Sequence, residues 1–273
     1  MKIVIKILAL TIGMFLAGCE DVITIDFDTV SPKLVIDAAI DWKKNTPGNV
    51  QRIKLSTTTG YYSREFPTVS GAAIAILNSN GDIFHFVETS VAGEYLCTDF
   101  IPAIAETYTL TVSLNGQNYT AEETLIGTAS IEDNIVQSNS GGMTGDEIEI
   151  TYYYQDDANE DNYYLHRTVT PQVAFPQFRT ENDEFSQGNL ISESYSHEDL
   201  TIGDHVNIKL YGVSRRYYEY FNKLIIASGG DTGPFPSTPV AVRGNIINQT
   251  DFNNFAFGYF RLCEVDEKEY TIQ

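Results

Sequence analysis

The densest group of candidate metal ligands in the chain is an acidic stretch, Asp156-Asp157-Ala158-Asn159-Glu160-Asp161-Asn162. Carboxylate and amide oxygens suit Ca²⁺, so Asp157, Asn159 and Asp161 are candidate calcium ligands. The stretch lacks the central glycine and the distal glutamate of an EF-hand loop. Asp and Asn side chains in a turn also bond to their own backbone, which requires no ion. We therefore predict no metal cofactor and keep these three residues as the candidate ligands should an ion bind.

Residues typical of catalysis are present but do not form a recognisable motif. The histidines have no second metal ligand at HExxH or HxH spacing. There is no Gly-x-Ser-x-Gly motif, and no cysteine has a histidine nearby in the sequence. A two-carboxylate glycosidase cannot be identified by counting pairs in a chain with 37 acidic residues. We predict no catalytic residues and a protein that is not an enzyme. The four histidines, of which the first two fall in strand-like segments and are expected to pack or face solvent, are His85, His166, His197 and His205.

A clearer chemical signal lies near the start, where Leu16-Ala17-Gly18-Cys19 follow a basic Met1-Lys2 and an apolar run. This order indicates a secretory signal peptide over residues 1–18. The apolar run is shorter than the roughly 20 residues of a bilayer span. The small pair before Cys19 resembles the bacterial lipoprotein signal, which implies cleavage before Cys19 and a diacylglycerol lipid on its sulfur. An ordinary signal peptide followed by a chance cysteine is the alternative.

Residues 19–32 form an acidic leader in which Glu20 and Asp21 directly follow the cysteine. This pattern resembles the export signal that sends Bacteroidota lipoproteins to the cell surface, whereas a merely solvated leader is the alternative. Asp28-Thr29-Val30 also resembles an O-glycosylation triplet of that phylum, with Thr29 as the acceptor. We therefore expect a lipid-anchored protein of the outer membrane that is exposed on the cell surface.

The net charge limits the partners of the chain. The formal charge is −20, and it becomes −22 in the mature chain because Lys2 and Lys6 are removed with the signal peptide. Such a chain repels phosphate backbones, which argues against nucleic-acid binding. It also repels anionic lipid surfaces, so the lipid on Cys19 is the expected membrane attachment.

Residues 33–125 contain seven short strand-like segments. The segment 107–114 alternates cleanly, with Tyr108, Leu110, Val112 and Leu114 on one face. Two hairpin signals, Ser79-Asn80-Gly81 and Asn115-Gly116, separate neighbouring segments. Such closely spaced strands predict an immunoglobulin-like β-sandwich. The segments are 33–40, 50–56, 72–78, 82–88, 93–97, 107–114 and 117–124.

The second half begins after residues 126–145, which are rich in Gly and Ser and are expected to form a linker or long loop. Residues 146–273 are predicted to form a second β-rich domain with one amphipathic helix at 214–228. The helix has Ser214 as its N-cap, apolar residues at helical spacing and glycines at its end. The elements of 171–204 cannot be placed from the sequence. Together the two halves predict a mainly β fold.

Two cysteines besides Cys19 are Cys97 and Cys263, one in each predicted domain. In an exported protein they could form a disulfide that joins the domains. The alternative is a pair of buried free thiols, which behave as small apolar side chains. The sequence cannot decide the distance between them.

Tyrosines occur in runs, so that neighbouring rings point to opposite faces of their element. When one ring of a run is in the core, the next is free to contact a glycan, a peptide or a protein partner. We take Tyr61, Tyr62 and Tyr153 as the candidate contacts. Packing of the second ring against a loop or the other domain is the alternative. The runs are Tyr61-Tyr62, Tyr152-Tyr153-Tyr154, Tyr163-Tyr164 and Tyr217-Tyr218.

The order of several short motifs resembles a family of Bacteroidota outer-membrane lipoproteins, domain-of-unknown-function family 4249. The resemblance implies a lipoprotein encoded beside a TonB-dependent transporter, and no catalytic residues or ligand come with it. The expected function is that of a non-catalytic accessory protein of such a transporter barrel, which captures ligand or caps the pore. A stand-alone surface lipoprotein that binds a glycan or peptide is the alternative, and an enzyme is a third hypothesis without a motif. The motifs are Cys19-Glu20, Leu34-Val35-Ile36, Val69-Ser70-Gly71-Ala72, Gly93-Glu94-Tyr95, Tyr108-Thr109-Leu110, Asn162-Tyr163-Tyr164, Tyr217-Tyr218-Glu219-Tyr220, Gly244-Asn245-Ile246 and Gly258-Tyr259-Phe260.

Overall fold

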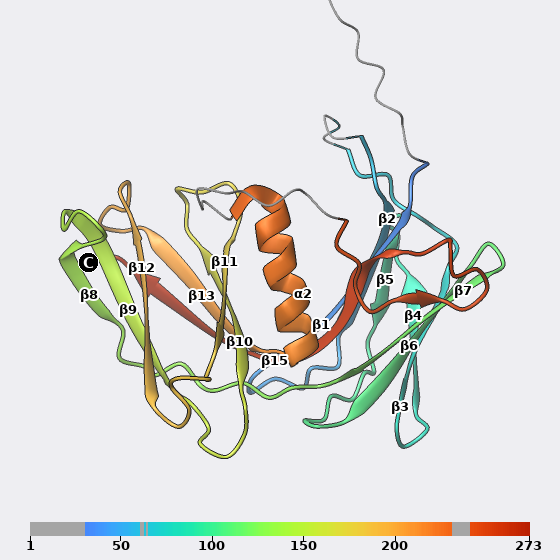
Figure 1. Ribbon diagram of the computed structural model, residues 1–273, viewed down its shortest axis with the longest axis horizontal. Helices are drawn as coiled ribbons and strands as arrows, with labels where there is room; N and C mark the ends of the chain where they lie inside the picture. The colour runs from blue at the N-terminus through green and yellow to red at the C-terminus, as the bar shows by residue number, and fades with distance from the viewer. Residues whose placement is uncertain (1–30, 61–62, 64, 231–240) are drawn as a thin grey trace, which may run out of the picture. The chain divides into compact units, whose positions relative to one another are not determined.

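The computed structural model describes residues 31–60, 63, 65–230 and 241–273 (Figure 1). All of the described strands and helices belong to one compact unit, Pro32–Gln273, called the second unit below. Within the described residues, no helix has the length and apolar character needed to cross a membrane. Several predicted features lie outside the described residues, namely the signal peptide, Cys19, Glu20, Asp21, Thr29, Tyr61 and Tyr62.

The second unit is mainly β, and α2 is the single α-helix among the residues that the structure describes, as the sequence predicts. Alternating burial along most strands shows why they form, because apolar side chains occupy every second position of a half-buried strand. The elements are β1 (Leu34–Lys43), β2 (Gln51–Thr57), β3 (Ala73–Asn78), β4 (Ile83–Glu88), β5 (Glu94–Cys97), β6 (Thr107–Leu114), β7 (Gln117–Thr124), β8 (Val136–Gly141), β9 (Glu147–Gln155), β10 (Tyr163–Val169), β11 (Gln177–Asn182), β12 (Leu190–His197), β13 (His205–Gly212), α2 (Arg215–Ile225), a π-helical turn (Ile226–Gly230), β14 (Ile247–Asn248) and β15 (Phe257–Thr271).

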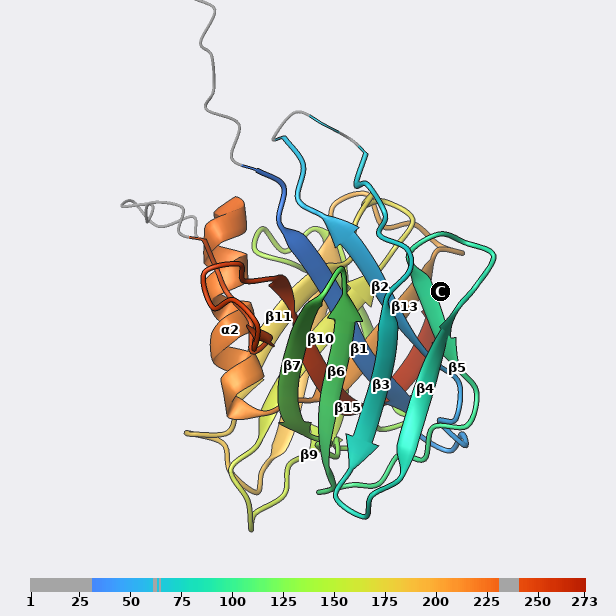
Figure 2. The same cartoon turned by 90° about the vertical axis from the view of Figure 1, so that its right-hand side faces the viewer.

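The first seven strands form a β-sandwich with the strand arrangement of an immunoglobulin-like domain. One layer has the order β1-β2-β5, and the other has the order β4-β3-β6-β7. Figure 2 shows β3, β4, β6 and β7 side by side in front of β1 and β2. The buried side chains between the layers form one apolar core, with Ile36, Ile53, Ile76, Tyr95 and Leu110 fully enclosed.

The two predicted hairpins of this sandwich are both present. Residues Asn115 and Gly116 connect β6 to β7 with φ angles of 49° and 76°. Two successive positive φ angles define a type I′ turn, whose twist matches that of the flanking strands. The turn at 79–81 connects β3 to β4, with Leu77 paired to Ile83. Local turn chemistry therefore sets the register of both hairpins.

Strand β15 connects the first half of the unit to the second. Its first part pairs in parallel with β1, from Val35 opposite Phe257 to Lys43 opposite Val265. Its second part pairs in antiparallel with β13, from Val265 opposite Tyr211 onward. Each half of the unit thus contains part of one 15-residue strand. The sheet continues without a break between the regions predicted as separate domains.

The second half is also built from two layers. The sheet β12-β9-β8 packs against β10, β13 and the end of β15 through buried residues that include Ile150, Tyr154 and Ile208. Strands β11 and β12 occupy much of the segment 171–204, whose elements cannot be placed from the sequence. The segment 126–145, expected to be a linker or long loop, contains β8 and a parallel bridge between Ile126 and Cys263.

Helix α2 covers the other face of β10, β13 and β15. The Ser214 side chain accepts a hydrogen bond from the Tyr217 amide at 3.2 Å, which confirms the predicted N-cap. Tyr217 is the buried residue of the helix, and its ring meets the Tyr259 ring edge to face at 5.0 Å. β15 therefore sends Phe260 into the first core and its neighbour Tyr259 toward the helix.

Candidate functional site

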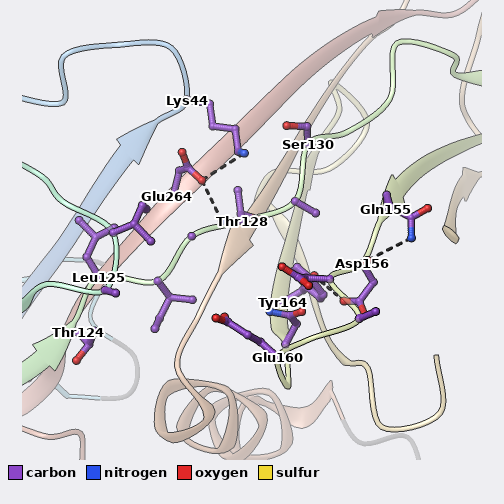
Figure 3. A pocket seen from close by; sticks show the side chains of 18 residues that line it. Lys44, Thr124, Leu125, Thr128, Ser130, Gln155, Asp156, Glu160, Tyr164 and Glu264 are labelled. Atoms are coloured by element: carbon purple, nitrogen blue, oxygen red, sulfur yellow. Dashed lines mark hydrogen bonds and ion pairs between the residues drawn. The ribbon is translucent and has the colours of Figure 1, made fainter. Parts of the chain in front are cut away.

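A pocket with a volume of about 810 Å³ lies at the junction of the two halves (Figure 3). This volume is within the range of small-molecule sites, roughly 300–1,000 Å³. Three parts of the chain line it: the segment 124–130 after β7, the turn 155–160 after β9, and single residues from elsewhere, of which Lys44 and Glu264 carry charge. Its lining mixes apolar side chains such as Ile104 and Leu125 with these charged groups.

One wall of this pocket is fixed by hydrogen bonds to β15. The Glu264 amide donates to the Ile126 carbonyl at 2.8 Å, and the Thr128 amide donates to the Glu264 carboxylate at 3.0 Å. Further along, the Ile131 amide donates to the Asp266 carboxylate at 2.7 Å. Lys44 lies 3.3 Å from the same Glu264 carboxylate. A stretch that would otherwise be a loop is therefore held beside β15 by backbone and carboxylate contacts.

The opposite wall is held by Asp156, which is 3% exposed. Its carboxylate accepts hydrogen bonds from the Tyr164 hydroxyl at 2.7 Å and from the Gly188 amide at 2.8 Å. A buried carboxylate is stable only when such donors replace water. Asp156 thereby ties the β9–β10 turn to the loop between β11 and β12.

The candidate calcium ligands have local roles. The Asp157 carboxylate accepts hydrogen bonds from the Asn159 amide at 2.9 Å and from the Asn159 side chain at 2.8 Å. The backbone bond, followed by the side-chain bond, lowers the pKa of Asp157. Asp161 lines a different pocket. Across the part of the chain that the structure describes, no group of three or more His, Cys, Asp or Glu side chains is placed to hold a metal ion.

A second, smaller pocket of about 140 Å³ lies between the layers of the second half, beside His166. The His166 ring is 3% exposed, and its Nδ1 lies 2.8 Å from the Tyr152 hydroxyl. Burial, with a smaller effect of the Arg179 charge, lowers the pKa of His166 to about 3. The ring is therefore neutral at physiological pH. Arg179 also lines this pocket and forms an ion pair with the buried Glu193 at 2.9 Å.

A buried charge absent from the predicted sites lies where β1, β15 and α2 meet. Arg261 is 8% exposed and pairs with the Asp41 carboxylate. Its guanidinium donates to the Tyr217 hydroxyl at 3.1 Å and lies 5.0 Å from the centre of the Tyr211 ring. A buried arginine is stable only with such partners. The sequence does contain one sign of this buried charge, because Arg261 stands within the apolar run of residues 255–263.

The two cysteines outside the signal region are free and buried. Cys97 belongs to the first core, whereas Cys263 lies beneath α2. Burial raises the pKa of both thiols, that of Cys97 to about 11. Both side chains therefore have the packing role that was one of the two alternatives.

Neighbouring tyrosines within the described runs differ in burial, because adjacent residues of a strand or helix point in different directions. In β9, Tyr152 and Tyr154 are in the core, and Tyr153 is half-buried on the outer face. Tyr153 lies outside the pocket at the junction, the pocket beside His166 and the pocket that Asp161 lines. The role of Tyr153 as a contact residue stays a prediction.

The fold and the pocket define a β-sandwich protein with a ligand-sized cavity. The family described as "Domain of unknown function (DUF4249)" matches residues 20–269, and the chain belongs to this family. A comparison with curated proteins finds no match.

Solved structures with similar folds include a two-domain fibronectin type III segment from chicken tenascin, with 13% identity, a TM-score of 0.22, and coverage of 66% of this chain and 90% of that one. A cytokine receptor complex matches with 8% identity, a TM-score of 0.27, and coverage of 68% and 86%. A DUF4785 family protein from Legionella pneumophila subsp. pneumophila str. Philadelphia 1 matches with 8% identity, a TM-score of 0.27, and coverage of 66% and 52%. At these identities the likeness concerns the fold alone.

Proposed function

We propose that this chain is a lipid-anchored lipoprotein of the Bacteroidota outer membrane, exposed on the cell surface, and that it serves as a non-catalytic accessory protein of a TonB-dependent transporter. Its body captures ligand for the barrel or caps the pore, and the acyl lipid on Cys19 holds it at the membrane. The observation that carries the binding role is the pocket of about 810 Å³ at the junction of the two halves.

Two further features support this proposal. The sequence Leu16-Ala17-Gly18-Cys19 followed by Glu20-Asp21 has the order of a lipoprotein signal and a surface-export signal. The walls of the pocket are fixed by bonds to β15 and by the buried Asp156, so the cavity exists before a ligand arrives. A preformed cavity lowers the ordering cost of binding.

The partner is tested by co-purification. The full chain with a C-terminal affinity tag is isolated from detergent-solubilised membranes of its own bacterium, and bound proteins are identified by mass spectrometry. We expect a TonB-dependent barrel to elute with the chain, and to be lost with Cys19→Ser, which removes the lipid. A chain that always elutes without a barrel would overturn the transporter role.

The pocket is tested separately by native mass spectrometry of the same preparation. Ser130 lines the pocket and is exposed, so Ser130→Trp should fill the cavity without disturbing the core. Ser140, exposed on β8, gives the matched control Ser140→Trp. We expect a bound small molecule in the natural chain and in the control, and none in Ser130→Trp. Equal occupancy of both variants would place the ligand elsewhere.

A further inference from the structure

A third pocket, of about 400 Å³, lies between the start of α2, the start of β10 and the end of β11. It receives the second ring of two tyrosine runs. Tyr164 and Tyr217 are in the core, whereas their neighbours Tyr163 and Tyr218 are half-buried and line the pocket. The two lining rings meet at a centroid distance of 5.3 Å. Two elements far apart in the sequence therefore bring two aromatic faces to one place.

The rest of the lining is almost entirely polar. Asn182 donates to the Tyr218 hydroxyl at 3.3 Å, and its backbone is in register with Tyr163 across β10 and β11. Gln187 is exposed at the rim, and Arg215 is paired with Glu219 at 3.0 Å. Amide, carboxylate and guanidinium groups supply both donors and acceptors around the rings. The further carboxylates of the lining are Asp161, Asp183 and Glu184.

We infer that this pocket is a binding site for neutral glycans, with Tyr163 and Tyr218 as the stacking surface. A sugar ring has an apolar face, which suits an aromatic ring, and a rim of hydroxyls, which suits paired donors and acceptors. An apolar ligand would leave the polar lining unpaired. Four carboxylates against one guanidinium repel phosphates and acidic sugars. The inference goes beyond the proposed function and does not depend on a transporter partner.

The fixed geometry of the pocket supports this role. The Asp183 carboxylate accepts a hydrogen bond from the backbone amide of Asn162 at 2.7 Å, and Asp183 is 4% exposed. The Val213 amide donates to the Tyr163 carbonyl at 2.9 Å, which holds the start of β10 against the segment before α2. The stacking rings are thus carried by a strand and a helix whose ends are fixed. Rigid elements position contact residues more accurately than loops do.

The test uses the purified full mature chain and saturation-transfer NMR with four neutral disaccharides: maltose, cellobiose, lactose and N,N′-diacetylchitobiose. We expect at least one of them to bind. Tyr218→Ala should weaken that binding about tenfold, since it removes a stacking surface, whereas Tyr218→Phe should retain most of it. Gln187→Ala, at an exposed position, should weaken binding about threefold without affecting the fold. Tyr270→Ala is the matched control, because Tyr270 is equally half-buried and lies on β15 outside this pocket.

The outcomes are separable. Binding of none of the four disaccharides would overturn the inference, as would binding that Tyr218→Ala leaves unchanged or that Tyr270→Ala weakens as much as Tyr218→Ala does. Stronger binding of trilysine than of any disaccharide would identify a site for cationic peptides and would also overturn it. Co-purification of a barrel is a different measurement, so either proposal can fail while the other stands.

Discussion

Glu267 provides a test of how the two halves are held together. It lies on β15 opposite Lys209 of β13, and its carboxylate is 2.8 Å from Lys43 at the end of β1. Asn207 donates to the same carboxylate at 2.6 Å. Burial alone would raise the pKa of Glu267, but these partners together lower that pKa to about 2. One side chain thus joins a strand of the first half to a strand of the second.

The expected magnitude follows from this shift. A carboxyl whose pKa falls from 4.5 to about 2 on folding stabilises the folded state by roughly 3 kcal/mol at neutral pH. The Lys43 side chain is 57% exposed, so solvent screening reduces this to about 1–2 kcal/mol. Because the folded pKa is the lower one, the contribution is complete above pH 4.5 and is lost as the pH falls toward 2.

Glu267→Gln should therefore lower the free energy of unfolding by about 1–2 kcal/mol at pH 7, and by roughly half as much at pH 3. Urea unfolding followed by the fluorescence of Trp42, the single tryptophan, measures both values. Glu122→Gln is the control, since Glu122 is exposed on β7. An equal loss at both pH values, or the same loss in the control, would show that Glu267 does not provide this link.

Three further predictions concern the core. Gly258 has a φ of 99°, and a Cβ added there would overlap a backbone carbonyl of β1. Gly258→Ala should therefore lower the free energy of unfolding in urea by at least about 3 kcal/mol. Gly81→Ala is the control: its φ is 92°, but no atom lies near an added Cβ, so the loss should be about 1 kcal/mol. Cys97 and Cys263 should resist a thiol reagent in the folded chain and react as two thiols after unfolding without reductant; a result of no thiols would show a disulfide. His166 is neutral when folded and takes up a proton when unfolded below pH 6.5, so stability should fall by about 2 kcal/mol from pH 7 to pH 5 on its account. His166→Gln should flatten that part of the pH profile, and an unchanged slope would contradict the assignment.

Features set by local residue patterns could be predicted from the sequence. The strand at 107–114 and the Asn115-Gly116 turn follow from alternation and turn chemistry, and both match the structure. The helix could be located because Ser214 caps it and its apolar residues recur at helical spacing. The edge strand β11 could not, since its sequence QFRTEN is largely polar and exposed. Edge strands carry a weak pattern because one side has no partner.

Features that depend on distant segments could not be predicted. The double pairing of β15 with β1 and β13 joins residues more than 200 positions apart in the first case. The pocket at the junction of the two halves likewise combines Lys44, the segment 124–130 and the turn 155–160. The tyrosine runs predicted that neighbouring rings point to opposite faces of their element. They could not show that Tyr163 and Tyr218 meet, because a strand and a helix must first pack together.

The proposed function depends most on the membrane tether at Cys19. Mass spectrometry of the N-terminal peptide of the mature protein, isolated from membranes, examines this tether without intermediate steps. We expect a chain that begins at Cys19 and carries a thioether-linked diacylglycerol. An unmodified N-terminus on a protein recovered from the culture medium would rule out the lipid anchor.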